Sequence, residues 1–415
     1  MPKEPIKIVI VGGGFGGVYA LLHLHKLFHG NEKVEISMVN KKNYFLFTPL
    51  LHEVATGNIN PINIVEPIRK ILGCCLHNFV VGEVIKADLD NKKLETSEGT
   101  LEFDYLVLAP GADTNFYGIP GAEDNSFTLK TLDDAIKLKG HLIDMVDKAS
   151  LEMDPGKRKE MLSFVIVGAG PTGVELTAEM EEFLRHTFSK YYKKEVIDDI
   201  SIKLIQRGEE ILPQLSKPLR GRGAKTLEKK GVEIFLNSSV KKVEGGMVEL
   251  EDGRILKSKT IVWVAGVKPA YVPFLKEVAC EVGGRVKVKD TLDLDCYPYV
   301  YAIGDVAGHK SEDGALSPML AQVAVKQSSV VAHNIKNHME GRTLKSFFYK
   351  SSGSFVSLGK WMAIGEVHGL KIYGHFAWFV WRTIYLSKLV SMRKKVKVAV
   401  DWTMNIFSAR DISRL

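Results

Sequence analysis

Two glycine-rich loops with the same spacing, far apart in one chain, limit what these 415 residues can fold into. The first, GGGFGG at 12–17, follows the apolar run IKIVIV at 6–11; the second, GAGPTG at 168–173, follows FVIV at 164–167. In this context a strand passes through a tight turn into a helix, whose first N–H groups face a pyrophosphate. Two such loops predict two bound dinucleotides, and two purely structural turns are the alternative. The expected contact residues are Gly12, Gly14, Gly16, Gly17, Gly168, Gly170, Pro171, Thr172 and Gly173.

The overall composition is that of an ordinary globular protein. Hydrophobic residues make up 45% of the chain and charged residues 25%, and the length allows two or three packed units. The first residues lead directly into the strand predicted at 6–11, without an apolar leader segment. Four cysteines are too few for a disulfide scaffold and fit a reducing compartment. We therefore expect exposure to the cytosol.

A third motif, YPYVYAIGDVAG at 297–308, describes an apolar strand that ends in Gly304 and Asp305. We expect the Asp305 carboxylate to accept a hydrogen bond from a sugar hydroxyl of a cofactor, and a solvated aspartate in a strand-end turn is the alternative. Two more apolar strands, at 103–112 and 260–270, end in small-residue turns and are interpreted as the crossovers between the nucleotide units. Their turn residues, also expected near the cofactors, are Ala109, Pro110, Gly111 and Gly266.

The order of these motifs resembles that of the two-dinucleotide-binding flavoprotein reductases. Over nearly the whole chain it is similar to the type II NADH:quinone oxidoreductases. The closer resemblance is carried by NYFLFTPLLHEVATG at 43–57, GVEL around Glu175, LAQVAVKQ at 320–327 and the aromatic C-terminal end. It implies FAD on the first loop, NADH or NADPH on the second, and a membrane quinone as electron acceptor, without proton pumping. Hydride would pass from the nicotinamide to the flavin and two electrons from there to the quinone.

The resemblance also assigns roles to Glu175 and Gln322. It places Glu175 at the flavin–nicotinamide junction, where a polar side chain orders the nicotinamide or tunes the flavin. Gln322 would hydrogen-bond a quinone carbonyl, and the small Ala321 would leave room for a flat ring. The alternatives are a first-turn carboxylate favoured by the helix dipole and a structural glutamine.

Two positions depart from the usual pattern, in which an acid at the end of the second strand of each unit binds the ribose hydroxyls. In the first unit this place falls on Asn40, followed by Lys41, and an amide can still accept one hydrogen bond from FAD. In the second unit it falls on Gln206, followed by Arg207. Without a carboxylate to repel a 2′-phosphate, and with Arg207 able to pair with it, we hypothesise appreciable use of NADPH. Gln206 serving NADH beside a solvated Arg207 is equally compatible.

Histidines and cysteines exclude several chemistries. The 12 histidines form no H-E-x-x-H and the four cysteines form no CxxC, so we predict no metal. Cys74 and Cys75 are adjacent and cannot form an ordinary bridge; with Cys280 and Cys296 they are interpreted as small apolar residues. This argues against disulfide chemistry and against sulfide as the donor. A related flavin reductase with another donor or acceptor, and a flavin-bearing redox-sensing protein, are the alternative functions.

The basic excess lies at the C-terminal end. The net charge is +7, and from residue 371 onward nine Lys or Arg stand against two Asp. Segments 373–390 and 392–407 are apolar and aromatic between these charges, but neither is a clean stretch long enough to span a bilayer. Such segments attract an acidic lipid surface or nucleic acid.

Three tryptophans in these segments favour the lipid surface. Trp378 and Trp381 lie in the first segment, and Trp402 has helical spacing with Val398 and Ile406 in the second. Trp beside Lys and Arg is typical of a segment that lies on a bilayer. We predict a peripheral membrane protein on the cytoplasmic face, without nucleic-acid binding, and expect trimming from about residue 372 to release a soluble flavoprotein. A homodimer interface explains the aromatic residues, although it explains the charge less well, and is also expected.

These segments combine into an α/β architecture of two Rossmann-like domains, the second inserted in the first, followed by an amphipathic membrane-binding segment. We expect the FAD domain at 1–120 and 271–345, the NAD(P)H domain at 121–270, and the membrane or dimer segment at 346–415. The charged stretch EMDPGKRKEM at 152–161 is interpreted as a surface loop.

Overall fold

The computed structural model describes residues 4–72, 78–311, 314–351 and 353–414. The chain divides into two compact units, each formed from three stretches. The first unit contains Met1–Leu46, Val65–Asp113 and Lys268–Ser351; the second contains Phe47–Ile64, Thr114–Val267 and Ser352–Leu415. Two of the passages between units, after Asp113 and after Val267, lie at the small-residue turns that were interpreted as crossovers.

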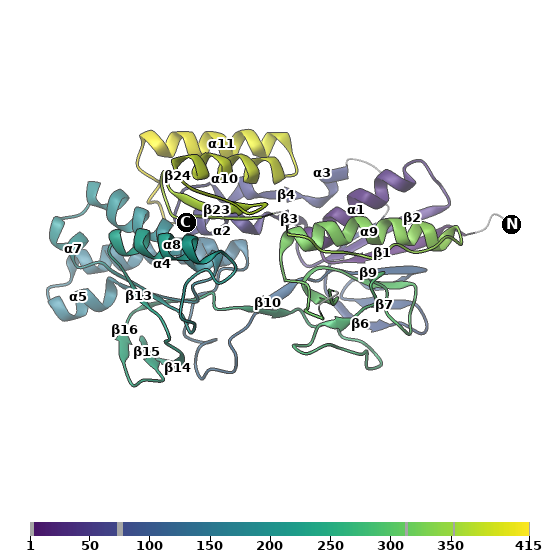
Figure 1. Ribbon diagram of the computed structural model, residues 1–415, viewed down its shortest axis with the longest axis horizontal. Helices are drawn as coiled ribbons and strands as arrows, with labels where there is room; N and C mark the ends of the chain where they lie inside the picture. The colour runs from purple at the N-terminus through teal and green to yellow at the C-terminus, as the bar shows by residue number, and fades with distance from the viewer. Residues whose placement is uncertain (1–3, 73–77, 312–313, 352, 415) are drawn as a thin grey trace. The chain divides into compact units, whose positions relative to one another are not determined.

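A parallel five-stranded sheet in the order β20–β9–β1–β2–β5 forms the centre of the first unit (Figure 1). Its strands are β1 (Ile6–Val11), β2 (Val34–Asn40), β5 (Asn78–Val81), β9 (Tyr105–Leu108) and β20 (Val300–Ala302). Helices α1 (Phe15–Phe28) and α9 (Ala321–Met339) pack against each other on one face. Val9 and Leu106 on the other face share a core with Leu94 of a small antiparallel sheet. That sheet contains β6 (Val84–Asp88), β7 (Lys93–Thr96) and β8 (Gly99–Glu102).

The strands form because β-branched and leucine runs are buried on both faces, which is typical of parallel sheets. Short elements complete the unit: β3 (Tyr44–Leu46), β4 (Val65–Pro67), α3 (Ile68–Leu72), β19 (Val286–Lys287), η5 (Gly304–Val306) and β21 (Ala307–Gly308).

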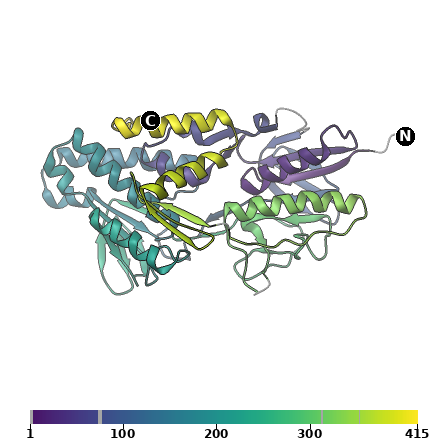
Figure 2. The same cartoon turned by 45° about the horizontal axis from the view of Figure 1, so that its top comes forward.

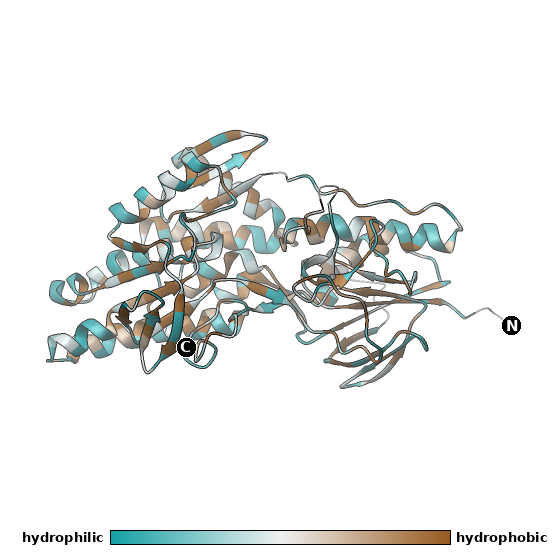
Figure 3. Cartoon of the chain, turned by 60° about the horizontal axis from the view of Figure 1, so that its bottom comes forward, coloured by the Kyte–Doolittle hydropathy of each residue, from teal (hydrophilic) through white to brown (hydrophobic). Residues whose placement is uncertain are grey.

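The second unit repeats the plan with a parallel four-stranded sheet in the order β13–β12–β11–β17. Its strands are β11 (Ser163–Val167), β12 (Ser201–Ile205), β13 (Val232–Phe235) and β17 (Thr260–Trp263). Helix α6 (Pro171–Glu181) follows β11, and α4 (Leu132–Leu151) begins at a capping box in which Thr131 and Asp134 bond each other's backbone N–H. Figure 3 shows hydrophobic colour concentrated on the strands of this unit. The predicted α/β class with two Rossmann-like sheets is therefore confirmed.

Shorter elements surround this sheet. They are β10 (Ala112–Thr114), α5 (Pro155–Met161), η3 (Glu182–Thr187), η4 (Phe188–Lys190), α7 (Lys194–Asp198), α8 (Lys217–Lys229), β14 (Val240–Glu244), β15 (Met247–Leu250), β16 (Ile255–Lys257) and β18 (Val267–Pro269). The surface loop predicted at 152–161 is wrong in part, because α5 occupies most of it. Asp154 caps this helix by accepting from the N–H groups of Gly156 and Lys157, and a proline is favourable at its first position.

The segment Phe47–Ile64, expected with the first domain, packs in the second unit. It contains η1 (Thr48–Leu50), α2 (Leu51–Ala55) and η2 (Pro61–Ile64). Leu51 and Val54 of α2 are buried, and α2 packs on α4 and α6. Apolar burial against these two helices accounts for the placement.

The C-terminal end also belongs to the second unit. It forms an antiparallel sheet of β22 (Ser354–Ser357), β23 (Ala363–Val367) and β24 (Leu370–Gly374), then helices α10 (His375–Lys388) and α11 (Met392–Phe407). The two helices, yellow in Figure 2, lie side by side, with the Trp381 and Trp402 rings 5.7 Å apart. No helix in the described ranges is both long and apolar enough to cross a membrane.

The three tryptophans do not lie at the surface, so the prediction that they face a bilayer is wrong. Trp378, Trp381 and Trp402 are at most 2% exposed, and Val398 is fully buried. They belong to the buried interior of the second unit, and a chain trimmed from residue 372 would lose all three.

Candidate functional site

The first glycine loop has the geometry of a pyrophosphate cradle. Gly12 has φ of 100°, and a Cβ there would lie 2.1 Å from the Ala109 carbonyl oxygen. A Cβ on Gly17 would lie 1.8 Å from the Gly12 carbonyl oxygen. Gly14, the N-cap of α1, has open space where a Cβ would be, so a phosphate can approach the N–H groups at this helix start.

The second loop reproduces this geometry. Gly168 has φ of 107°, and a Cβ on Gly173 would lie 1.8 Å from the Gly168 carbonyl oxygen. Gly170, the N-cap of α6, again faces open space, and Pro171 occupies the first helical turn next to Thr172. Only glycine fits the crowded positions, so the repeated spacing reflects a repeated backbone structure.

The side-chain amides of Asn40, at the end of β2, and Gln206, just after β12, make equivalent hydrogen bonds in the two units. The Gly13 N–H donates to Asn40 Oδ1 at 2.7 Å, and the Ala169 N–H donates to Gln206 Oε1 at 3.2 Å. Each amide therefore braces its own glycine loop, which sequence reasoning did not foresee. Their neighbours are exposed: Lys41 lies 3.2 Å from Glu83 Oε1, and Arg207 is at the surface of the second unit.

Other predicted residues of the first unit gather around its loop. Gly16 lies against Ala109, whose turn continues through Pro110 and Gly111. At the end of β20, Gly304 has φ of 71° and donates its N–H to Gln327 Oε1 at 2.7 Å. Gln327 is fully buried, and its position in the AQVAVKQ run was the signal available for finding it.

The turns also position three half-buried predicted residues. Asp305 lies in the 3₁₀ turn that follows β20, and Ala321 and Gln322 form the first turn of α9. In the second unit, a Cβ on Gly266 would lie 2.1 Å from the Tyr117 hydroxyl. Tyr117 thus covers the second crossover turn, a contact that no sequence pattern indicated.

Glu175 lies in the interior of the second unit. Its side chain comes from α6 and is 5% exposed as a residue; Oε1 accepts from the Ser357 N–H at 3.0 Å, and Oε2 is 3.8 Å from His52 Nδ1. Burial raises the pKa of Glu175 to about 8 and lowers the pKa of His52 to about 3. At neutral pH both groups are therefore largely uncharged, and their contact is not an ion pair.

A second buried acid, Glu53, was missed although it stands in the quoted segment 43–57. It is 1% exposed, and Trp402 Nε1 donates to its Oε2. Burial, and to a smaller extent the negative charge of the nearby Glu179, raises the pKa of Glu53 to about 8. Glu179 is in turn paired with Arg410 Nη2 at 2.6 Å. Two adjacent titratable residues, His52 and Glu53, within an apolar run were the available signal.

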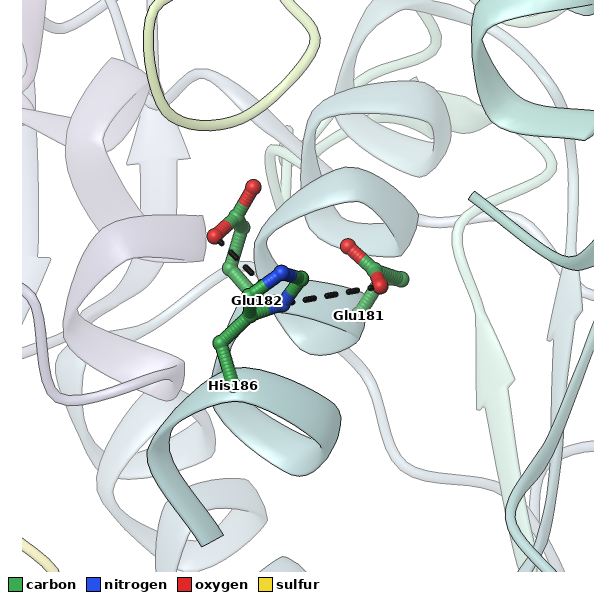
Figure 4. Close-up of side chains that lie close together, drawn as sticks. All are labelled: Glu181, Glu182 and His186. Carbon is green, nitrogen blue, oxygen red and sulfur yellow. Dashed lines mark ion pairs between the residues drawn. The ribbon is translucent and has the colours of Figure 1, made fainter. Parts of the chain in front are cut away.

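A separate acidic cluster, shown in Figure 4, lies where α6 continues into the π-helical turn η3. Glu181, Glu182 and His186 bring ligand atoms within 4.8 Å of one another. Lys230 Nζ lies 3.1 Å from Glu181 Oε2 and also bonds Glu182. The lysine already supplies the cation for both carboxylates, so the cluster is an internal ion-pair network of the second unit.

The interpretation of the cysteines as small apolar residues is wrong for the two that the structure describes. Cys280 and Cys296 are free and exposed, which corrects their interpretation as packed apolar residues. Cys74 and Cys75 lie outside the described residues.

The fold and the paired loops define a class of protein. The sequence profile of the pyridine nucleotide-disulphide oxidoreductases matches residues 6–328, most of the chain, so the chain belongs to this family. A second profile, the NDH2 C-terminal domain, matches residues 351–411.

Within this class the chain belongs to the type II NADH:quinone oxidoreductases, as the motifs predicted. It is 32% identical over 405 residues to the type II NADH:quinone oxidoreductase of Staphylococcus aureus (strain NCTC 8325), covering 96% of this chain and 97% of that protein. It is 28% identical over 430 residues to type II NADH:quinone oxidoreductase Ndh of Mycobacterium tuberculosis, covering 99% and 90%. The solved structure of NDH2 from Plasmodium falciparum in complex with NADH matches with a TM-score of 0.91 at 21% identity, covering 99% and 100% of the two chains.

Proposed function

We propose that this chain transfers hydride from NADH to FAD and passes two electrons on to a quinone. Its alignment with the NADH:quinone oxidoreductase of S. aureus over almost the full length of both proteins carries this conclusion. Bound FAD supplies the redox chemistry, because a flavin accepts two electrons as hydride and can release them to a quinone. The residues of the chain bind, orient and protonate.

The first unit is the proposed FAD site. The N–H groups at the start of α1 hold the pyrophosphate, and the open space at Gly14 fits a phosphate against the backbone. Asn40 keeps the loop in shape through its bond to Gly13. Asp305 binds a sugar hydroxyl of the cofactor, and the turn at Ala109 limits the space next to Gly12.

The second unit is the proposed NADH site. The start of α6 takes the pyrophosphate at Gly170, where the same open space is present. Glu175 lies one turn further along α6 and is proposed at the flavin–nicotinamide junction, as a largely protonated acid that tunes the flavin. Gln322, in the first turn of α9, is the proposed hydrogen-bond donor to a quinone carbonyl, and the small Ala321 precedes it.

NADPH is a second proposed coenzyme. Gln206 brings no negative charge to the end of β12, and Arg207 beside it is exposed. Replacing Arg207 with alanine is expected to lower kcat/KM for NADPH about tenfold (~1.4 kcal/mol) and to leave kcat/KM for NADH unchanged. Glu209→Ala, at a nearby exposed position, is the matched control. A preference of the unchanged protein for NADH above about a hundredfold would end this proposal.

Attachment to an acidic membrane surface is proposed for the outer face of α11. Five apolar side chains on this face are exposed between 52% and 84%, namely Met392, Val396, Val400, Met404 and Phe407. On α10, Phe376 and Phe379 are exposed by 68% and 54%. Lys and Arg side chains on the same helices supply attraction to anionic lipids, as in helices that lie in the bilayer interface. The cytoplasmic face is the proposed side.

Liposome pelleting tests this attachment. Val400→Glu with Met404→Glu should release the full-length protein from anionic liposomes at low salt, because both charges fall on the outer face. Met153→Glu, which alters a residue 90% exposed elsewhere in the same unit, is the matched control. If the double variant instead changes a homodimer into monomers and pellets as before, the face is a dimer interface.

Stopped-flow absorbance tests the catalytic function. Mixing the yellow holoenzyme with NADH should bleach the flavin, and mixing the product with a short-chain quinone should restore the colour at a rate that supports turnover. Rapid bleaching followed by slow recovery with every quinone would refute the proposed acceptor and favour a redox-sensing role.

A further inference from the structure

Three carboxylic acids meet where α2 packs on α6, and each is at most 5% exposed. Glu175 and Glu179 are separated by one helical turn of α6 and therefore lie on the same face of that helix. Glu53 comes from α2, next to His52, whose ring nitrogen is 3.8 Å from Glu175.

Two guanidinium groups from the C-terminal end face these acids. Arg410 pairs with Glu179 at 2.6 Å. Arg382 lies over the rings of Trp378 at 3.6 Å and Trp402 at 4.7 Å, and it interacts electrostatically with Glu179 and Glu53. Two cations balance only two carboxylates, and an uncompensated buried charge is expensive. The three acids of the cluster therefore keep at least one proton between them.

That proton belongs to Glu53 or Glu175, because Glu179 has Arg410 as a direct partner. The ionised form of Glu175 is supported by one backbone N–H, and that of Glu53 by the Trp402 indole N–H. Each acid, when ionised, disfavours ionisation of the other. The two acids are thus alternative holders of the proton.

We propose that Glu53 is a positioning residue for quinone reduction, which competes with Glu175 for one buried proton and so sets the pH range in which Glu175 is protonated. The inference rests on the proposed function. The overall reaction, NADH + H⁺ + quinone → NAD⁺ + quinol, takes two electrons and one proton from NADH. It therefore consumes one further proton, which a buried protonated carboxyl can supply.

Three titratable groups near Glu53, namely His52, Arg382 and Tyr385, keep one charge state near neutral pH. Burial lowers the pKa of His52 to about 3 and that of Arg382 to about 10, and it raises the pKa of Tyr385 well above its ordinary value. Lys139 of α4, on which α2 also packs, is paired with Asp411 at 3.0 Å. The groups that interact electrostatically with Glu53 include Glu175, Glu179, Arg382, Tyr385 and Arg410, and Trp402 donates a hydrogen bond to it.

Glu53→Gln tests the proposal in the full-length holoenzyme. Glutamine keeps the size of the side chain and still accepts from Trp402, but it cannot ionise. Without repulsion from Glu53, Glu175 should lose its proton at lower pH. The alkaline limb of the rate of flavin reoxidation by a short-chain quinone should then move down by about one pH unit. The rate of flavin reduction by NADH should stay within about twofold of the unchanged protein.

Glu181→Gln is the matched control, since Glu181 is on the same helix, is 3% exposed and bonds Lys230 instead. Its pH profile should coincide with that of the unchanged protein. Identical profiles for the unchanged protein and Glu53→Gln, with FAD bound in both, would overturn the proposal.

Infrared titration separates this inference from the proposed function. The C=O stretch of protonated Glu175 is assigned as the band that is missing in Glu175→Gln. In Glu53→Gln this band should disappear at a lower pH than in the unchanged protein, whether or not quinone is reduced. An unchanged titration of this band would also overturn the proposal. If Glu53→Gln fails to fold, Trp402→Phe serves, because loss of the indole donor destabilises ionised Glu53 and should shift the same band.

Discussion

Removing Arg410 tests whether the tail of the chain is held by a buried ion pair. Arg410 is 9% exposed and Glu179 is 3% exposed, with Arg410 Nη2 2.6 Å from Glu179 Oε2. Arg410 Nη1 also donates to the Thr56 carbonyl oxygen at 3.3 Å. Arg410→Met keeps much of the side-chain bulk and leaves the Glu179 carboxylate buried without its direct counter-charge.

The expected loss follows from these contacts. Breaking one side of a buried pair costs ~3–5 kcal/mol. Arg382 still acts on Glu179 electrostatically, so we expect the lower end, ~3 kcal/mol, for the unfolding free energy of the second unit. For a unit of this size, that corresponds to a fall in Tm of ~6–12 °C.

Urea unfolding followed by tryptophan fluorescence measures this loss, because Trp381 and Trp402 lie in the affected core. The double variant Glu179→Gln with Arg410→Met removes the stranded charge and should recover part of the stability. Lys139→Met is the matched control: it breaks the pair between Lys139 and Asp411, whose side chain is 60% exposed, and should cost less than ~1 kcal/mol. The reasoning is refuted if Arg410→Met unfolds at the same urea concentration as Lys139→Met, or if the double variant is less stable than Arg410→Met.

Four further substitutions have expected outcomes. Gly17→Ala places a Cβ 1.8 Å from a backbone oxygen and should abolish retention of the yellow cofactor, which flavin absorbance per chain measures. Gly173→Ala should keep the cofactor, but its rate should no longer saturate with increasing NADH, which an NADH titration measures. The raised pKa of Glu175, about 8 against an ordinary 4.5, means that the folded state holds a proton that the unfolded state has lost between these values. Stability should therefore fall as pH rises from about 4.5 to 8, and Glu175→Gln should flatten that slope by up to ~1.4 kcal/mol per pH unit in urea titrations. Lys230→Met should destabilise the protein by ~3 kcal/mol, because it strands two buried carboxylates, whereas the exposed Lys229→Met should not change the urea midpoint.

The sequence reveals local structure well because local structure depends on neighbouring residues. The backbone at Gly12 and Gly168 needs positive φ, and Gly17 and Gly173 need a missing Cβ; each requirement leaves a glycine at fixed spacing. Both loops, their strands and the helices that follow were therefore predictable, and so was the family.

The carboxyl cluster was not predictable in the same way. Trp402 reaches Glu53 across 349 positions and Arg410 reaches Glu179 across 231, and no periodicity links such residues. The prediction for α11 was wrong for another reason. This helix has apolar side chains on two faces, and hydrophobic spacing in the sequence does not tell which face is exposed to solvent. Val398 and Trp402 form the inner face, whereas the sequence pattern had assigned them to the bilayer.

The two-sided character of α11 has a practical consequence for anyone who wants this protein free of detergent. Deleting the helix would expose side chains that it buries, among them Glu53. The remaining protein would be expected to precipitate. Substituting the surface is the better route. Glutamate or lysine at the exposed positions of α11 alone would raise the solubility of the protein and leave its buried tryptophans in place. Crystals or cryo-microscopy grids should be attempted with such a surface variant before any shortened chain.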